Sequence, residues 1–193
     1  MKRVLFFFLI LFFLFTPLFA SGGYDHGTPT GLGQIQLDFT WNPFDLFETG
    51  QTYVVWGYGI TRQLDFHGYV SHEAAGTDQF YYGFMFNFFS SDWLDLSTAV
   101  GYRHRLKTTH IFFPQILYNF KFGDYSIGGS FVTVQEANRI KRNLGTTFDI
   151  AFFIPLKELY EWPNYVKNVK LGFGFFRPLS NKIYPTYSVD FTF

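Results

Sequence analysis

Apolar and polar residues alternate along most of this chain after residue 30, in about ten segments of roughly 8 to 12 residues. Successive side chains of a β-strand point to opposite faces, so a period of two predicts strands. In the first segment, Gly31 to Trp41, the residues Ile35, Leu37 and Phe39 share an apolar face with Trp41. The chain is therefore predicted to be all-β, and each strand has one apolar and one polar face.

The remaining segments follow the same pattern and are separated by turn signals. The predicted strands cover 52–60, 64–73, 79–89, 94–105, 110–122, 125–135, 144–153, 169–176 and 186–193. In 110–122 the apolar face should hold Phe112 and Ile116, opposite Gln115, although Pro114 removes a donor from the ladder there. In 144–153, Leu144 and the apolar residues that follow should form the apolar face.

The length of the strands separates two all-β architectures. Strands of a soluble sandwich usually have about 5 to 6 residues, and their apolar faces meet in one core. The strands here are about twice as long, and their apolar faces carry repeated Phe, Tyr and Trp, as in a barrel that crosses a membrane with about 9 to 11 residues per strand. We predict a closed antiparallel transmembrane β-barrel of ten strands, with eight strands as the main alternative.

The first twenty residues differ in composition from the rest. Lys2 and Arg3 precede an apolar stretch, and small residues follow around Ala20, which is the order of a secretory signal peptide. We predict a cleaved signal peptide over 1–20, a flexible segment over 21–30 and the barrel over 31–193. An uncleaved membrane anchor is the alternative, although no later stretch has the 18 or more apolar residues of a spanning helix.

Charge and cysteine content exclude several functions. Cleavage would remove two basic residues and leave 13 basic against 15 acidic ones, a formal charge of −2. This balance gives no electrostatic footprint for nucleic acid. The chain has no cysteine, so it forms no disulfide and no thiolate metal site. We predict no cofactor and no metal site.

An even number of strands would put both ends of the barrel on the periplasmic side. The short turns at 61–63, 90–93 and 123–124 would then be periplasmic, and the loops 42–51, 74–78, 106–109, 136–143 and 177–184 would face outwards. The long connection Pro155 to Asn168 is the exception on the periplasmic side. Its apolar residues would allow one or two amphipathic helical turns at the membrane surface.

The polar faces define the residues expected inside the barrel. The charged and titratable residues of this predicted lumen network are Asp38, Asp65, His67, Asp95, Arg103, Arg105, Lys121, Asp149, Lys170 and Asp190. Most strand glycines also fall on this face, and Gly68 and Gly129 are exceptions. In a barrel of about ten strands the lumen is only slightly wider than one filled by side chains, so these charges are expected to pair inside it.

The last strand has a pattern of its own. Tyr187, Val189, Phe191 and Phe193 alternate with polar residues, and Phe193 is the last residue given. This pattern resembles the C-terminal β-signal of bacterial outer-membrane proteins, and the segment 56–65 is similar to a hairpin common in porin-like proteins. The resemblance implies an outer-membrane barrel of a Gram-negative-type bacterium, with membrane lipid and the β-barrel assembly machinery as partners.

The function is less constrained by the sequence than the fold. We expect a structural barrel or a narrow passage for a small solute or ion, and we expect no enzymatic activity. His67 and Ser71 share a strand face but would lie about 13 Å apart at about 3.3 Å per residue, too far for proton transfer. A lipid-modifying hydrolase with His72 or His104, and a surface-interaction protein using the loop Pro43 to Phe47, are the alternatives.

Overall fold

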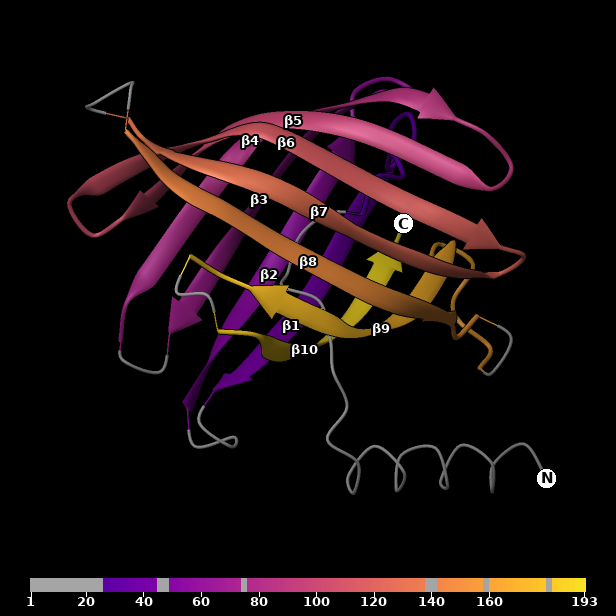
Figure 1. Ribbon diagram of the computed structural model, residues 1–193. Helices are drawn as coiled ribbons and strands as arrows, with labels where there is room; N and C mark the ends of the chain where they lie inside the picture. The colour runs from indigo at the N-terminus through magenta and orange to yellow at the C-terminus, as the bar shows by residue number, and fades with distance from the viewer. Residues whose placement is uncertain (1–25, 45–48, 74–75, 138–141, 158–159, 180–181) are drawn as a thin grey trace.

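Ten antiparallel strands close into a barrel in this protein (Figure 1). The computed structural model describes residues 26–44, 49–73, 76–137, 142–157, 160–179 and 182–193. The strands are β1 Ile35–Phe44, β2 Thr49–Gly59, β3 Leu64–Glu73, β4 Asp78–Ser90, β5 Leu94–Arg105, β6 Thr108–Phe122, β7 Tyr125–Glu136, β8 Asn143–Pro155, β9 Asn168–Arg177 and β10 Tyr184–Thr192. Each strand pairs with the next along the chain, and β10 pairs with β1. The predicted closed ten-stranded barrel is therefore confirmed.

The barrel has an apolar outside and a largely polar inside. Large outward side chains such as Phe84, Phe88 and Phe131 each leave 49% of their surface exposed. Inward polar side chains such as Asp65 and Asn119 are almost fully buried. Because a water-soluble barrel would place its apolar face inside, this arrangement is that of a barrel whose outer wall faces hydrocarbon. Within the described ranges, no helix is long and apolar enough to cross a membrane.

The barrel closes where the first and last strands pair, and we call this contact the closing seam. Figure 1 shows the indigo β1 next to the yellow β10. On the outer face, Phe39 packs edge-on against Phe191, and Trp41 stacks on Tyr187. On the inner face, Asp38 and Asp190 are direct cross-strand partners.

Two opposed carboxylates destabilise a strand pair unless other groups compensate their charge. The closing seam therefore combines attractive ring packing outside with a like-charge pair inside.

Strand β6 corrects one prediction about side-chain direction. Phe112 was expected on the outer face, but it points inward and is 1% exposed. The pairing of β6 with β7 shifts register between Phe112 and Gln115, next to Pro114. Two residues of β6 here stand opposite one residue of β7, which makes a β-bulge. The bulge reverses the alternation of side chains, so Phe112 points inward and Phe113 faces outward.

A second register shift corrects the position of Leu144. We expected Leu144 on the outer face of β8, but it packs against the buried interior cluster that includes Tyr53 and Val134. The β7–β8 pairing shifts register between Val134 and Gln135. Val134 pairs with Gly145 and Gln135 pairs with Asn143, so that Leu144 is left without a partner in the ladder. Both errors arise because strict alternation cannot predict a bulge.

The first strand begins later than expected. The alternation suggested a start at Gly31, but β1 begins at Ile35. Gly31 and Gly33 have φ values of 97° and 70°, in the left-handed region that side chains disfavour. These two glycines turn the chain from the lumen into the wall.

Gly68 and Gly129, which lie on the outer face, have direct aromatic partners. Gly68 pairs with Trp56 across β2 and β3, and Gly129 pairs with Tyr118 across β6 and β7. The Tyr118 hydroxyl reaches past Gly129 and donates to the Asp149 carbonyl oxygen at 3.1 Å. Each glycine thus leaves space for an aromatic ring on the outer wall. This explains why these two glycines lie on the outer face, whereas most strand glycines lie on the inner face.

Replacing Gly68 with alanine should destabilise the barrel by about 1–3 kcal/mol, since overpacking a filled site costs that much. A Cβ there would overlap the Trp56 ring and the Tyr81 carbonyl oxygen. The measurement is the urea dependence of unfolding from detergent micelles or vesicles. Val70→Ala, on the outer face of the same strand, serves as the control and should change stability little. Equal stability of Gly68→Ala and wild type would contradict the overlap.

The long connection between β8 and β9 packs against the outside of the barrel. The Leu156 amide donates to the Val169 carbonyl at 2.8 Å, and the Lys167 amide donates to the Thr192 carbonyl at 2.8 Å. Trp162 packs edge-on against Phe191, and Tyr165 stacks on Phe193. The helical turns considered from the sequence are absent from residues 156–157 and 160–167, the described part of the connection.

Candidate functional site

The chain before β1 enters the lumen and crosses it. We define the lumen segment as residues 26–30, of which His26, Gly27 and Thr30 have buried side chains or backbone. Its contacts lie on the inner faces of β3, β4, β5, β6 and β10. The described part of the segment 21–30, for which the sequence predicts flexibility, makes specific contacts inside the barrel.

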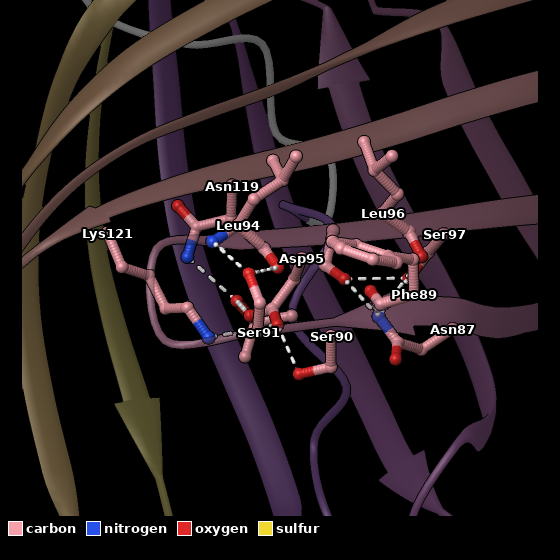
Figure 2. Close-up of polar contacts among 12 residues, drawn as sticks. Asn87, Phe89, Ser90, Ser91, Leu94, Asp95, Leu96, Ser97, Asn119 and Lys121 are labelled. Carbon is pink, nitrogen blue, oxygen red and sulfur yellow. Dashed lines mark hydrogen bonds and ion pairs between the residues drawn. The ribbon is translucent and has the colours of Figure 1, made fainter.

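Asp95 is the centre of one group of contacts with the lumen segment. Its carboxylate accepts hydrogen bonds from the Thr28 hydroxyl at 2.7 Å and the Ser90 hydroxyl at 2.6 Å, and the Lys121 ammonium lies at 3.0 Å. Asn119 donates to the Thr28 hydroxyl oxygen at 2.7 Å. Figure 2 shows Asp95 between Lys121 and Ser90, with Asn119 beside them. The Thr28 hydroxyl thus occupies a polar site formed by Asp95 of β5 and Asn119 of β6.

The backbone of Gly27 is held by two side chains of neighbouring strands. Its carbonyl oxygen accepts from Ser97 at 2.6 Å and from Asn87 at 3.2 Å. Asn87 and Ser97 also bond each other at 3.2 Å (Figure 2). A Cβ on Gly27 would lie 2.7 Å from the Leu117 carbonyl oxygen, closer than real Cβ atoms approach. The site therefore accepts only glycine at this position.

At the other end of the lumen segment, Thr30 contacts β1, β2 and β3. Its backbone amide donates to the Asp65 carboxylate at 2.7 Å, and its hydroxyl donates to the Gln36 side chain at 3.5 Å. A Cβ on Gly57 would lie 2.8 Å from the Thr30 hydroxyl oxygen. Gly57 thus makes room for the lumen segment.

His26 lies beside the closing seam. Its Nε2 atom is 3.3 Å from the Asp190 carboxylate, and its ring packs edge-on against Phe153. Lys170 is the cross-strand partner of Asp190 on the other side. The pair Asp38 and Asp190 is therefore flanked by hydrogen-bond donors from the lumen segment and from β9, which offsets the repulsion across the seam.

An aromatic layer fills the lumen on the side of the longer loops. Tyr53, Tyr69, Tyr81 and Phe112 contact one another in sequence, with ring centroids 5.1 to 5.3 Å apart. All four are at most 4% exposed, and Val132 and Val134 complete the same cluster with no exposed surface. This layer is packed like a protein core.

Polar groups hold the edge of the aromatic layer. The Arg103 guanidinium lies 4.8 Å from the centre of the Phe112 ring, a cation–π contact. The Tyr81 hydroxyl is 3.2 Å from His67 Nε2 and accepts from Gln115 at 2.9 Å. These contacts fix the rings in the lumen.

The residues of the predicted lumen network lie in several parts of the barrel interior. Near the lumen segment lie Asp38, Asp65, Asp95, Lys121, Lys170 and Asp190. His67 and Arg103 bound the aromatic layer, and Arg105 follows Arg103 along the same face of β5 towards the loop. Asp149, on β8, accepts from the Ser130 amide at 2.5 Å and from the Ser130 hydroxyl at 2.9 Å.

Sequence reasoning missed the residues that hold the lumen segment. Asn87, Ser97 and Asn119 are uncharged inward residues, and nothing in the alternation distinguishes them from other lumen residues. The inward glycines were the available signal, because Gly57 and Gly128 leave the space that Thr30 and His26 occupy.

The proposed assembly-signal residues lie where the alternation put them. Tyr187, Val189 and Phe191 face outward on β10, while Ser188 and Asp190 are buried inside. Phe193 follows β10, and its amide donates to the Ile35 carbonyl at 2.8 Å. Phe191 and Phe193 stack on each other and are partly covered by the β8–β9 connection.

The histidines considered for catalysis have ordinary partners. Ser71 accepts from Gln51 at 2.9 Å, whereas His67 pairs with Tyr81. His72 is 2.7 Å from Asp78 on the exposed rim, and His104 is 3.1 Å from the Thr109 hydroxyl. In the part of the chain that the structure describes, no group of three or more His, Asp or Glu side chains is placed to bind a metal ion.

Comparison with known proteins gives only distant structural matches. No protein-family model and no curated protein sequence matches this chain. A triple mutant of the Rhodopseudomonas blastica porin is 14% identical over 75% of this chain and 45% of that one, with a TM-score of 0.37. Another mutant of the same porin is 12% identical over 90% of this chain and 53% of that one, also with a TM-score of 0.37.

The chain thus spans about half the length of the porin chains that it matches. The architecture, a closed antiparallel barrel with an apolar outer wall and a largely polar interior, is that of a transmembrane β-barrel.

Proposed function

We propose that this protein is an integral outer-membrane β-barrel that acts as a structural barrel with a narrow passage, closed at rest, for ions or small solutes. The observation that carries the proposal is the filled lumen. The lumen segment occupies one half, and the aromatic layer occupies the other. An open general pore would need a hydrated channel where these groups are packed.

The outer wall supports the membrane part of the proposal. Exposed Phe, Val and Ile side chains face outward on β1 to β8, and aromatic residues such as Trp93, Tyr125 and Tyr165 lie near the ends of the strands. Aromatic girdles at both interfaces are a feature of outer-membrane barrels. We place the short turns on the periplasmic side, together with the β8–β9 connection and both chain ends.

Export by a cleaved signal peptide over 1–20 is part of the same proposal, and these residues lie outside the described ranges. So does most of the loop Pro43 to Phe47, which was considered for surface interaction. The contacts of His67, His72 and His104 support a barrel without enzymatic activity.

Reconstitution in planar lipid bilayers tests the passage. We expect brief and small conductance steps from the full chain, because the lumen must rearrange before ions pass. The R. blastica porin serves as the control in the same bilayer. Long-lived conductance comparable to that of the porin would contradict a closed lumen. If no conductance steps were recorded, the proposed passage would be wrong and only the structural role would stand.

Fractionation of the producing cell tests the location independently. We expect the protein in the outer-membrane fraction, resistant to extraction by high salt and carbonate, because its outer wall is apolar. Recovery in the soluble periplasmic fraction would overturn the proposed location.

A further inference from the structure

We propose that the lumen contains a peptide-binding site, that its occupant is the chain's own lumen segment, and that this segment leaves and returns as a removable plug. The inference rests on the proposed closed barrel and names the segment that closes one half of it. The ligand class is a short peptide with a bend at a glycine, followed by hydroxyl and amide donors.

The first argument is that the lumen segment is bound to the wall without being part of the sheet. In the described residues, backbone-to-backbone hydrogen bonds to the wall begin only at Leu32 and Gly33, which meet Gly59. Residues 26–30 are held by side chains of the wall instead. The ladder between β1 and β10 is complete without them. The segment can therefore leave without breaking a strand pair.

The second argument is that the wall is chemically matched to the occupant. Three carboxylates, those of Asp65, Asp95 and Asp190, receive the Thr30 amide, the Thr28 hydroxyl and the His26 ring. The donors Ser97 and Asn87 meet the one carbonyl that the segment presents between them, that of Gly27. Donors meet acceptors at each contact, as in a peptide-binding site.

The third argument is that the site selects by shape. The Cβ that any other residue would add to Gly27 would meet the backbone of β6, which cannot move as a side chain can. In the wall itself, Gly57 of β2 and Gly128 of β7 leave the space that Thr30 and His26 fill. Larger residues at these positions would exclude the segment. The glycines on both sides therefore determine specificity.

The fourth argument is that the emptied site would hydrate. Its walls carry Asp65, Asp95, Asp190, Asn87, Ser97 and Asn119, which are polar and buried and each contact the segment. Buried polar groups without partners are costly, and water entering from the end of the barrel would satisfy them. The open state is thus a water-filled half-lumen, and not a collapsed core.

A reversible disulfide tests whether the segment moves. The pair Thr30→Cys with Gly57→Cys suits the geometry, because the 2.8 Å between the Gly57 Cβ position and Thr30 Oγ1 is close to the roughly 3 Å from Cβ to the far sulfur of a disulfide. The chain has no other cysteine. We expect the disulfide to form on oxidation and to abolish the conductance steps, which should return on reduction. The single Thr30→Cys variant is the control, and steps that persist in the oxidised pair would overturn the plug.

Thiol labelling gives a readout that does not depend on conductance. Thr30 is 8% exposed, so a cysteine there reacts with a maleimide only when the segment leaves. We expect complete labelling of Thr30→Cys in the folded barrel, at least about tenfold slower than for a cysteine replacing the exposed Leu106. A residue-30 cysteine that stays unlabelled until the barrel is unfolded would show that the segment is a fixed part of the core, and would overturn the inference.

Peptide binding tests the site itself. The variant Gly27→Val cannot seat its own segment, and we expect it to bind a fluorescent peptide with the sequence of residues 26–33. The same peptide with valine in place of Gly27 should bind at least about tenfold more weakly. Equal binding of the two peptides, or none by a folded Gly27→Val barrel, would overturn the binding site. If bilayers stay silent while labelling and peptide binding succeed, the proposed passage fails and the peptide site stands.

Discussion

Replacing Gly174 with alanine should leave most of the protein unable to reach the folded barrel. Gly174 lies on the inner face of β9 and pairs with Ala151 of β8 and Thr186 of β10. A Cβ at this position would overlap the carbonyl oxygen of Ile150, which belongs to the backbone of β8. Since the neighbouring strand must move as a whole, we expect a loss of about 3 kcal/mol or more. The folded fraction is measured by its resistance to unfolding in sodium dodecyl sulfate without heating.

Gly172 provides the matched control for this prediction. It lies two residues earlier, on the same face of the same strand, but its Cβ would meet the Ser188 hydroxyl and the Phe153 ring, which are ends of side chains. These groups can rotate away, so Gly172→Ala should fold in good yield. If the two variants fold equally well, the backbone overlap at Gly174 does not govern the pairing of β8 with β9.

Replacing Phe191 and Phe193 with alanine should reduce the amount of barrel inserted in cells roughly tenfold. Such a reduction corresponds to an increase of about 1.4 kcal/mol in the activation free energy of the rate-limiting step. Both residues belong to the alternate outward row of the last strand, which we propose as the assembly signal. A strand edge docks by its backbone while alternate side chains fill pockets of the partner, so the loss of two rings weakens recognition. Pulse-chase measurement of protease-resistant barrel follows the insertion.

Recognition must be separated from stability, because Phe191 also packs against Phe39 and Trp162. The control is the pair Phe86→Ala and Phe88→Ala, two exposed outward residues of β4. This pair should lower stability in lipid without slowing insertion. Normal insertion rates for the Phe191 and Phe193 variant, or equal delay in both variants, would contradict a special role of the last strand.

The period of two predicted most of this fold. It fixed the strand number and the inward position of residues such as Asp65 and Asp149, because a closed wall with two unlike faces leaves little freedom in side-chain direction. It failed where the wall is locally irregular. Phe112 and Leu144 follow bulges, and a bulge adds a residue without any change of composition.

The candidate site was less accessible to sequence reasoning than the wall. The lumen segment makes its contacts far along the chain, for example between His26 and Asp190, and no local pattern encodes such a pairing. Thr28 and Thr30 are common in loops, so they carry no signal by themselves. The inward glycines were the one sequence feature that could have signalled a further occupant of the lumen, since Gly57 leaves the space that Thr30 fills.

The closing seam carries a constraint on how the chain can be rearranged. The lumen segment, continuous with β1, reaches across the seam to Asp190, and the β8–β9 connection grips β10 from outside through Thr192 and Phe191. Strand order alone would allow circular permutation at any loop, since every strand has two paired neighbours. A cut between residues 30 and 35 would also keep every ladder of the wall, but it would separate the lumen segment from β1. The continuity of the lumen segment with β1 is therefore a constraint that the strand order does not show.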